Sequence, residues 1–240
     1  MSINPHETPE TVNDELAPDA LLSCTRCPRL VEHRRSVAAS KRKAYQDDTY
    51  WGQPVPGFGD RNARLMILGL APGAHGSNRT GRQFTGDASG RFLWAALHRA
   101  GLASSDTSLH RGDGLRVSNL WITAAVRCVP PGNKPTTLEQ QHCRPWLADD
   151  LAQLTHLRVV LALGSFAHDA YLRWLQASGR RIVKKAVPFA HAAHHDLTDE
   201  QPGHHLVDSY HVSFQNTNTG RLTETMFDAA LEHALALADA

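Results

Sequence analysis

Leu65-Met66-Ile67-Leu68 is a run of four large apolar residues, followed at once by a glycine-rich stretch that begins at Gly69. A short apolar run bounded by turn residues predicts a buried β-strand. Two further runs rich in branched residues, 117–126 and 159–163, have the same character. Each of the three is followed by a stretch with helical periodicity, so strand and helix are expected to alternate.

The alternation of strands and helices predicts the fold class. Helices are expected over 91–100, 137–154 and 166–175, with a last amphipathic helix over about 223–237. Thr136 and Glu139 have the spacing of a capping box at the start of the second helix. A fourth strand is expected to end near Tyr210. Because parallel strands need helical crossovers, the pattern predicts an α/β protein, a three-layer α/β/α sandwich with a central, mostly parallel four-stranded sheet.

Length and composition favour one domain. The chain has 240 residues and an ordinary hydrophobic fraction, so we expect a single domain over 21–240. Residues 1–20 contain few large apolar side chains and are expected to form a loosely packed tail. Neither a bilayer-length apolar run nor a signal peptide is evident, which favours a cytoplasmic protein. The formal net charge of +1 means that binding to a polyanion would rely on local clusters.

The four cysteines fall into two pairs. Cys24 and Cys27 are separated by two residues, and Cys128 and Cys143 by fourteen. In a reducing compartment a disulfide framework is not expected, and four thiolates suit zinc or an iron-sulfur cluster. The wide second pair favours iron-sulfur over a zinc ribbon, while four unrelated core cysteines remain the alternative. Either metal would have a structural role.

The stretch after the first strand has the composition of a ligand-binding loop. It runs from Gly69 to Arg82 and continues into Phe84-Thr85-Gly86-Asp87. Its glycines allow tight turns and a close approach of a ligand. It matches neither a Walker loop nor a dinucleotide fingerprint. Since ligands of parallel sheets bind at the carboxyl ends of strands, a functional loop is favoured over a plain surface connection.

A second polar loop, 210–223, follows the last expected strand. The two loops and the cysteine spacing together resemble the uracil-DNA glycosylase superfamily, and within it the family 5 enzymes that carry an iron-sulfur cluster. Segments 50–60 and 127–135 agree with this resemblance, which extends from Cys24 to about Leu235. The resemblance implies a 4Fe-4S cluster on the four cysteines and a monomer that acts on DNA containing uracil or other deaminated bases, near the nucleoid.

The resemblance also implies a mechanism. The enzyme flips a damaged base out of DNA and hydrolyses its N-glycosidic bond, which leaves an abasic site. Phe84 would stack on the flipped ring, and His211 would donate a hydrogen bond to the charge that grows on the base. The catalytic candidates are His211 and Asn78. The substrate-binding candidates are Gly69, Ala71, Gly73, His75, Phe84 and Asp87, and the DNA-binding candidates are Arg82, Gln215, Asn216 and Arg221.

Two departures from the superfamily pattern affect these expectations. Related families carry a carboxylate where this chain has Leu70 or Ala71, so the attacking water would be held by Asn78, His75 or Asp87. Ala124 stands where related enzymes use an asparagine to recognise uracil, which predicts looser base choice that includes hypoxanthine.

Two other functions stay open at this point. They are a non-catalytic nucleic-acid binding module and a zinc-stabilised hydrolase of small nucleotides. The histidine-rich segment 188–211 could bind metal, but its irregular spacing favours a solvated loop, and it is assigned no role.

Overall fold

The computed structural model describes residues 18–198 and 204–240. In this part of the chain, six strands form one sheet in the order β1-β3-β2-β4-β6-β5. The four central strands are mutually parallel, and each edge strand pairs antiparallel with its neighbour. The strands are β1 (Phe58–Gly59), β2 (Leu65–Gly69), β3 (Leu120–Ala124), β4 (Val159–Leu163), β5 (His194–Asp196) and β6 (His205–Ser209). The expected four-stranded parallel sheet is therefore present, with two short strands added at its edges.

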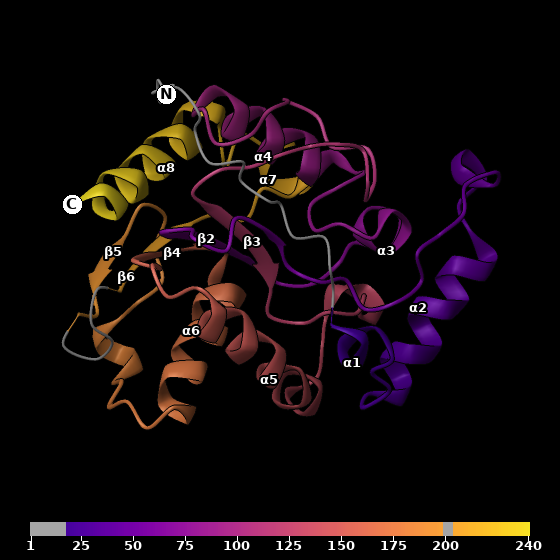
Figure 1. Cartoon of the computed structure of the whole chain (residues 1–240), viewed down its shortest axis with the longest axis horizontal. Coiled ribbons are helices and arrows are strands. Elements are labelled where there is room, and N and C mark those ends of the chain that lie inside the picture. The colour runs from indigo at the N-terminus through magenta and orange to yellow at the C-terminus, as the bar shows by residue number, and fades with distance from the viewer. Residues whose placement is uncertain (1–17, 199–203) are drawn as a thin grey trace, which may run out of the picture.

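Helices cover both faces of this sheet (Figure 1). On one face lie α4 (Ala88–Arg99) and α8 (Glu224–Asp239), and on the other α5 (Thr137–Gln153) and α6 (Ser165–Ala177). Side chains of β2 alternate between the two layers: Leu65 and Ile67 pack toward α4 and α8, whereas Met66 and Leu68 pack toward α5 and α6. Two apolar cores thus sandwich the sheet, and the predicted three-layer α/β/α sandwich is confirmed.

The remaining helices lie outside the two main layers. A pair near the N-terminus packs beside the carboxyl end of β3, and α2 lies at the periphery of the molecule (Figure 1). The pair consists of α1 (Asp19–Leu22) and α2 (Pro28–Ser40). The other short elements outside the two layers are α3 (Ser77–Thr80), α7 (Phe214–Asn218) and the 3-10 turns η1 (Lys43–Tyr45), η2 (Pro131–Asn133) and η3 (Lys184–Ala186).

Helix positions agree with the sequence analysis to within a few residues, which is the usual uncertainty of helix ends. The capping box between Thr136 and Glu139 is present at the start of α5. The strand expected over 117–126 is shorter, because pairing with β2 covers only Leu120 to Ala124. Most of the expected tail, residues 1–17, lies outside the described residues, and α1 already begins at Asp19. No helix among the described residues is long and apolar enough to cross a membrane.

The prediction of a solvated loop over 188–211 was wrong. This segment contributes β5 and β6, and Leu206 to Ser209 are buried between β4 and β5. The strand expected to end near Tyr210 is present as β6, but its histidine-rich flank did not indicate that β5 pairs with it or that this part of the segment is buried. Three of the four parallel strands have long apolar runs, whereas β6 contains only Leu206 and Val207 as large apolar residues.

Candidate active site

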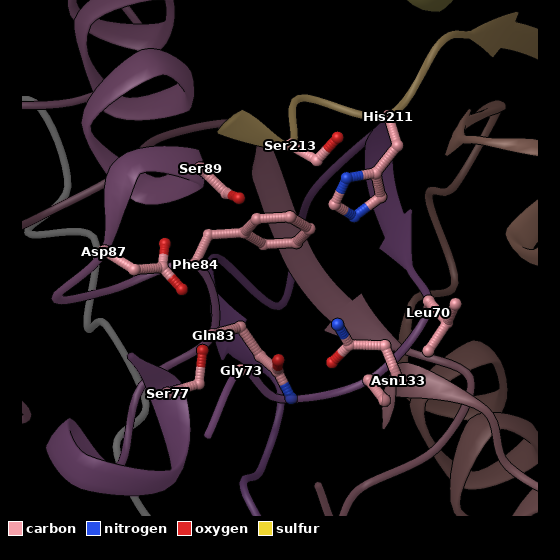
Figure 2. Close-up of a pocket in the computed structure, with 11 residues that line it drawn as sticks. Leu70, Gly73, Ser77, Gln83, Phe84, Asp87, Ser89, Asn133, His211 and Ser213 are labelled. Carbon is pink, nitrogen blue, oxygen red and sulfur yellow. The ribbon is translucent and has the colours of Figure 1, made fainter. Parts of the chain in front are cut away.

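A pocket of about 280 Å³ opens at the carboxyl end of the parallel sheet, between the loop after β2 and the loop after β6 (Figure 2). It contains five of the residues predicted from sequence: Ala71, Gly73, Phe84, Asp87 and His211. The other lining residues are Leu70, Ser77, Gln83, Ser89, Asn133 and Ser213. The two loops therefore meet at one site, where the topology of a parallel sheet places ligands.

The Phe84 and His211 rings form one side of this pocket. Their centroids lie 6.1 Å apart with a 35° angle between the ring planes. Phe84 has a left-handed backbone (φ +50°), a strained conformation for a bulky residue that its surroundings must enforce. The Trp94 indole Nε1 donates a 2.7 Å hydrogen bond to the Phe84 carbonyl oxygen. The flat face of a phenyl ring is thereby held toward the space beside the imidazole.

Two glycines make room for Phe84. A Cβ on Gly69 would lie 2.6 Å from the phenyl ring, and a Cβ on Gly90 would lie 2.1 Å from the Phe84 carbonyl oxygen. Real Cβ atoms do not approach so closely, so both positions require glycine in this arrangement. Gly69, predicted as a substrate-binding residue, thus lies behind the aromatic ring and acts by letting it sit close to the sheet.

His211 is positioned by the chain on both sides. The Asn216 side-chain amide donates a 2.8 Å hydrogen bond to the His211 carbonyl oxygen. A Cβ on Gly164, at the start of α6, would lie 3.3 Å from the His211 Cβ. Burial lowers the pKa of His211 from 6.5 to about 4. The imidazole is therefore neutral near pH 7, with one nitrogen able to donate and the other to accept.

Asp87 is the carboxylate of the pocket. It is the N-cap of α4, where its Oδ1 accepts a 3.0 Å hydrogen bond from the Gly90 N–H. Burial raises the pKa of Asp87, while its backbone hydrogen bonds act in the opposite direction. A Cβ on Gly76 would lie 2.2 Å from Oδ2, and one on Gly73 would lie 2.8 Å from it. The glycines of the first loop thus leave space around this oxygen.

Two of the three residues considered for holding water, Asn78 and His75, lie outside the pocket lining. Asn78 is completely buried on α3 and donates through Nδ2 to the Arg34 carbonyl oxygen at 3.3 Å. The His75 ring lies 3.0 Å from the Tyr50 hydroxyl, measured from Nδ1. Since neither side chain lines the pocket, the structure favours Asp87 among the three residues considered for holding water.

The structure does not support the prediction that Arg82 binds DNA. Its side chain is only 2% exposed, and its Nη1 donates to Asp113 at 2.6 Å and to Ser108 at 2.9 Å. The guanidinium also lies over the Phe58 ring at 4.5 Å. A buried and paired arginine is not exposed to a DNA phosphate, so the structure supports a role for Arg82 in holding the loop and not the predicted DNA contact. The glycine-rich loop turns inward at this point, which its polar composition did not reveal.

Two amide side chains in the pocket were missed by the sequence analysis. Asn133 lies on the exposed turn η2 in a left-handed conformation (φ +57°), and Gln83 is buried and donates to the Val55 carbonyl oxygen at 3.2 Å. The run Pro130-Pro131-Gly132 before Asn133 was a signal for a tight turn after a strand. Which side chain this turn presents to the pocket depends on its tertiary position.

The second loop places exposed side chains beside the pocket. Ser213 caps α7 and lines the pocket, while Phe214, the next residue, has a 63% exposed side chain. Gln215 and Arg221 are exposed as predicted for residues that approach DNA, and Arg221 lies 4.6 Å above the Tyr210 ring. Asn216 instead faces inward, toward the His211 backbone.

Comparison with known proteins agrees with this geometry. The family model of the uracil DNA glycosylase superfamily matches residues 56–235. A type-5 uracil-DNA glycosylase of Thermus thermophilus is 53% identical over 91% of this chain and 95% of its own, and one of Mycobacterium tuberculosis is 50% identical over 92% and 80%. The chain belongs to the uracil DNA glycosylase superfamily. A type-4 uracil-DNA glycosylase of Thermotoga maritima is more distant, at 28% identity over 75% of this chain and 81% of its own.

This superfamily member also brings its four cysteines together. Cys24 and Cys27 precede α2, Cys128 follows β3, and Cys143 lies on α5, yet all four line one small apolar pocket. The Cys143 sulfur accepts a 3.2 Å hydrogen bond from the Arg127 N–H. Burial raises the pKa of Cys128 to about 12 and that of Cys143 to about 11. Thiols with such pKa values are protonated near pH 7 unless a metal takes the place of their protons.

The spacing of the sulfurs bears on which metal group they fit. A single zinc ion with bonds of about 2.3 Å would hold its sulfurs about 3.8 Å apart. Among the described residues, no three of the cysteine sulfurs lie within 4.8 Å of one another, which is wider than a single zinc ion requires. The buried Arg34 guanidinium, whose Nη2 donates to the Cys24 carbonyl oxygen at 3.3 Å, adds positive charge beside the sulfurs. Four thiols spaced more widely than one zinc ion requires, beside the buried Arg34 guanidinium, fit a negatively charged iron-sulfur cluster.

Proposed function

We propose that this protein removes uracil from DNA by hydrolysing the N-glycosidic bond, which leaves an abasic site. The observation that carries the proposal is the pairing of a neutral His211 with the Phe84 ring in a pocket of about 280 Å³. Pockets for drug-sized ligands are generally larger, so this one suits a single base. The related type-5 enzymes are named for the same activity.

Binding of the flipped base would rest on Phe84. A base leaves the duplex at a cost of a few kcal/mol, and stacking on an aromatic face offsets part of that cost. The strained backbone of Phe84 and the glycines around it hold the ring ready before the base arrives. Little conformational entropy of the Phe84 side chain is therefore lost when the base binds.

His211 would stabilise the leaving group. When the bond between C1′ and the base nitrogen breaks, its electron pair moves onto the base and negative charge grows on a carbonyl oxygen. A neutral imidazole N–H aimed at that oxygen stabilises this charge in a site that excludes water. The lowered pKa of His211 keeps the ring in this neutral form at physiological pH.

Asp87 would hold the water. The water oxygen forms a bond to C1′ as the base departs, and the released proton passes to the Asp87 carboxylate or through it to solvent. The same negative carboxylate stabilises the positive charge that develops on the sugar. Its raised pKa makes it a better proton acceptor than an exposed aspartate.

Base choice would depend on amides other than the asparagine of related enzymes. Ala124 is buried in β3 and offers no polar group, whereas Asn133 and Gln83 line the pocket. Asn133 lies on an exposed turn, so its hold on the base edge is less rigid than that of an amide on the sheet. We therefore infer that other deaminated bases such as hypoxanthine are accepted beside uracil.

DNA contacts would come from the second loop. Phe214 is the large apolar side chain next to the pocket with the size to enter the gap that a flipped base leaves. Gln215 and Arg221 are exposed on the same loop and suit contacts to phosphates. Asn216 supports the loop through its bond to His211. A monomer suffices, because one chain contains every group used, and the site of action is the DNA of the nucleoid in the cytoplasm.

Cys24, Cys27, Cys128 and Cys143 would hold a 4Fe-4S cluster. None of the four is among the residues that line the active-site pocket, so the cluster would act as a structural cross-link. It would join the segment before α2 to the end of β3 and to α5. Equal iron and sulfide contents with a broad visible absorption band would support it, whereas one zinc per chain on these thiols would contradict it.

An abasic-site cleavage assay on uracil-containing oligonucleotides tests the proposed function. Wild-type protein is expected to generate alkali-sensitive sites, and the His211→Ala variant to lose most of this activity. Binding of the oligonucleotide without any abasic product from the wild type would instead support a non-catalytic binding module. Release of phosphate or base from free nucleotides alone would support the small-nucleotide hydrolase.

A further inference from the structure

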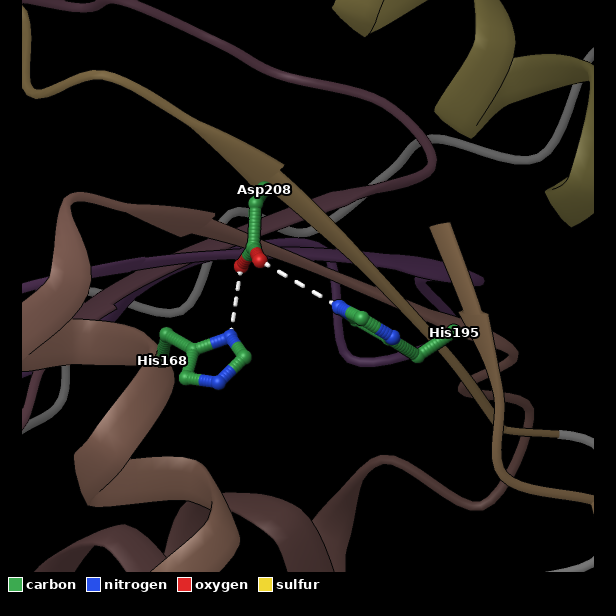
Figure 3. Close-up of side chains that lie close together, drawn as sticks. All are labelled: His168, His195 and Asp208. Carbon is green, nitrogen blue, oxygen red and sulfur yellow. Dashed lines mark hydrogen bonds and ion pairs between the residues drawn. The ribbon is translucent and has the colours of Figure 1, made fainter. Parts of the chain in front are cut away.

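A second cluster of chemically reactive side chains lies on the α6 face of the sheet. His168 comes from the first turn of α6, His195 from β5 and Asp208 from β6. Their donor atoms all lie within 4.8 Å of one another, and no other three-residue set among residues 18–198 and 204–240 meets that condition. Figure 3 shows a ring nitrogen of each histidine turned toward a different oxygen of the Asp208 carboxylate.

The sheet register explains why these side chains converge. His195 pairs with Leu206 across the antiparallel β5–β6 ladder, and Asp208 lies two residues further along β6, on the same face. This diagonal relationship brings side chains of neighbouring strands within reach. His168 then approaches from the helix layer that covers this face. Three separate elements thus position one set of donor atoms.

The ring nitrogens and carboxylate oxygens of this cluster do not all have complementary hydrogen-bond partners. His168 Nε2 lies 3.0 Å from the Val187 carbonyl oxygen and must donate there, so in a neutral ring Nδ1 presents a lone pair. That lone pair lies 2.9 Å from Asp208 Oδ1, which is also an acceptor. His195 Nε2 and Asp208 Oδ2 are 3.6 Å apart, and neither has a hydrogen-bond partner among the described residues. A cation between them would satisfy all four atoms.

Burial makes the mismatch costly. The Asp208 side chain is 0% exposed, and the side chains of His168 and His195 are 3% and 13% exposed. A carboxylate removed from water needs a charged or hydrogen-bonded partner on each oxygen. A doubly protonated His168 would satisfy Oδ1 alone and would leave Oδ2 and His195 Nε2 without a hydrogen bond, joined only by a long ion pair of 3.6 Å if His195 were protonated as well. That ion pair is the alternative to a metal ion.

We propose that His168, His195 and Asp208 bind one divalent transition-metal ion of the zinc class. The ligand atoms would be His168 Nδ1, His195 Nε2 and the Asp208 carboxylate. Bonds of about 2.0 to 2.1 Å in a tetrahedron place ligand atoms about 3.3 Å apart, and the observed 2.9 Å and 3.6 Å lie on either side of this value. Two imidazoles disfavour Mg²⁺ and Ca²⁺, which prefer oxygen ligands.

The surroundings of His168 match those of a metal ligand. Metal-binding histidines generally donate their second ring N–H to a carbonyl or carboxylate, which orients the ring, and Val187 supplies that carbonyl here. The ion would join α6, β5 and β6. Asp208 lies three residues before His211 on the same chain segment, so the ion would also stiffen the strand that leads to the active site. This role is structural and independent of the proposed glycosylase activity.

Metal binding to the full-length protein tests the proposal. Wild-type protein is dialysed against Co²⁺ or Zn²⁺, and bound metal is counted by elemental mass spectrometry. Co²⁺ on nitrogen and oxygen ligands gives weak visible bands without the intense thiolate charge-transfer band that Co²⁺ on the four cysteines would show. We expect one equivalent of such nitrogen- and oxygen-bound metal per chain, and a rise in Tm when Zn²⁺ is added.

Variants locate the ion. His195→Gln and Asp208→Asn are expected to weaken this binding at least tenfold and to abolish the Tm rise. His194→Gln is the matched control, because His194 is the neighbouring residue of β5 and lies among surface histidines, His205 and His233. If Asp208→Asn fails to fold, the result for His195→Gln decides the test, because His195 is less buried. Absence of nitrogen- and oxygen-bound cobalt in the wild type, or its loss in His194→Gln and not in His195→Gln, would overturn the proposal.

Discussion

The Phe84 ring lies 6.1 Å from the His211 imidazole, centroid to centroid, although the two residues belong to loops that follow different strands of the sheet. Both loops leave the carboxyl edge of the sheet, where the strands β2 and β6 flank β4. An aromatic face and a neutral hydrogen-bond donor thus share one pocket. The predictions below test what each contributes.

Replacing His211 should lower the rate of base release with little change in folding. We expect His211→Ala to reduce kcat by about 100-fold to 1,000-fold, which is typical of losing one donor at a developing negative charge. Single-turnover excision from a uracil-containing duplex measures this. His194→Gln, a change at a surface histidine, serves as the control. An unchanged single-turnover rate in His211→Ala would remove this residue from the mechanism.

Stability should depend on pH through His211. Because its folded pKa is lowered to about 4 from 6.5, the unfolded chain binds more protons between these values. The contribution is fully present above pH 6.5 and is lost as the pH falls toward 4. From pH 7 to pH 5 we expect a loss of about 2 kcal/mol of unfolding free energy from this group. Urea unfolding at both pH values should show a smaller loss in His211→Gln than in wild type, and equal losses would contradict the assignment.

Asp87 has two roles that substitutions separate. Asparagine caps helices as well as aspartate does, so Asp87→Asn should retain stability while its activity falls by about 100-fold. Asp87→Ala should lose the activity and also about 1 kcal/mol of stability, because the cap on α4 is removed. Excision kinetics combined with thermal unfolding distinguishes the two. An active Asp87→Asn enzyme would mean that the carboxylate only caps the helix.

Gly69→Ala should displace the Phe84 ring. The new Cβ would lie 2.6 Å from the ring, so we expect about 1 to 3 kcal/mol of destabilisation and weaker binding of the flipped base. A double-mutant cycle with Phe84→Leu provides the control, since leucine lacks the ring atoms that clash. Additive effects in denaturant unfolding would show that Gly69 does not act through Phe84.

Arg82 and Arg221 should behave differently. Arg82→Gln removes the charged partner of Asp113 and leaves only its backbone N–H donors, so it should cost about 1.5 to 3 kcal/mol of stability. Arg221→Gln should leave unfolding unchanged but weaken DNA binding and reduce its salt dependence by about one ion. Titrations at several salt concentrations, beside thermal unfolding, measure both. A stable Arg82→Gln variant with weakened DNA binding would instead support the original prediction that Arg82 contacts DNA.

Much of the fold could be predicted because its signals are local. The apolar runs of β2, β3 and β4 bury both faces of each strand, and the periodicity of the helices between them follows directly from one stretch of chain. The strand β6 could not be predicted in the same way. Its burial depends on β4 and β5 on either side, and its neighbours in sequence are mostly histidine and other polar residues.

The sequence by itself determined the layered α/β architecture, the two loops that meet at the pocket and the four cysteines, because each is encoded in a short pattern of residue types. Only the tertiary structure decided that Arg82 and Asn78 turn inward, that Asn133 lines the pocket and that His168, His195 and Asp208 converge. These outcomes depend on which distant segments pack against each side chain, and that packing sets burial, hydrogen bonding and charge.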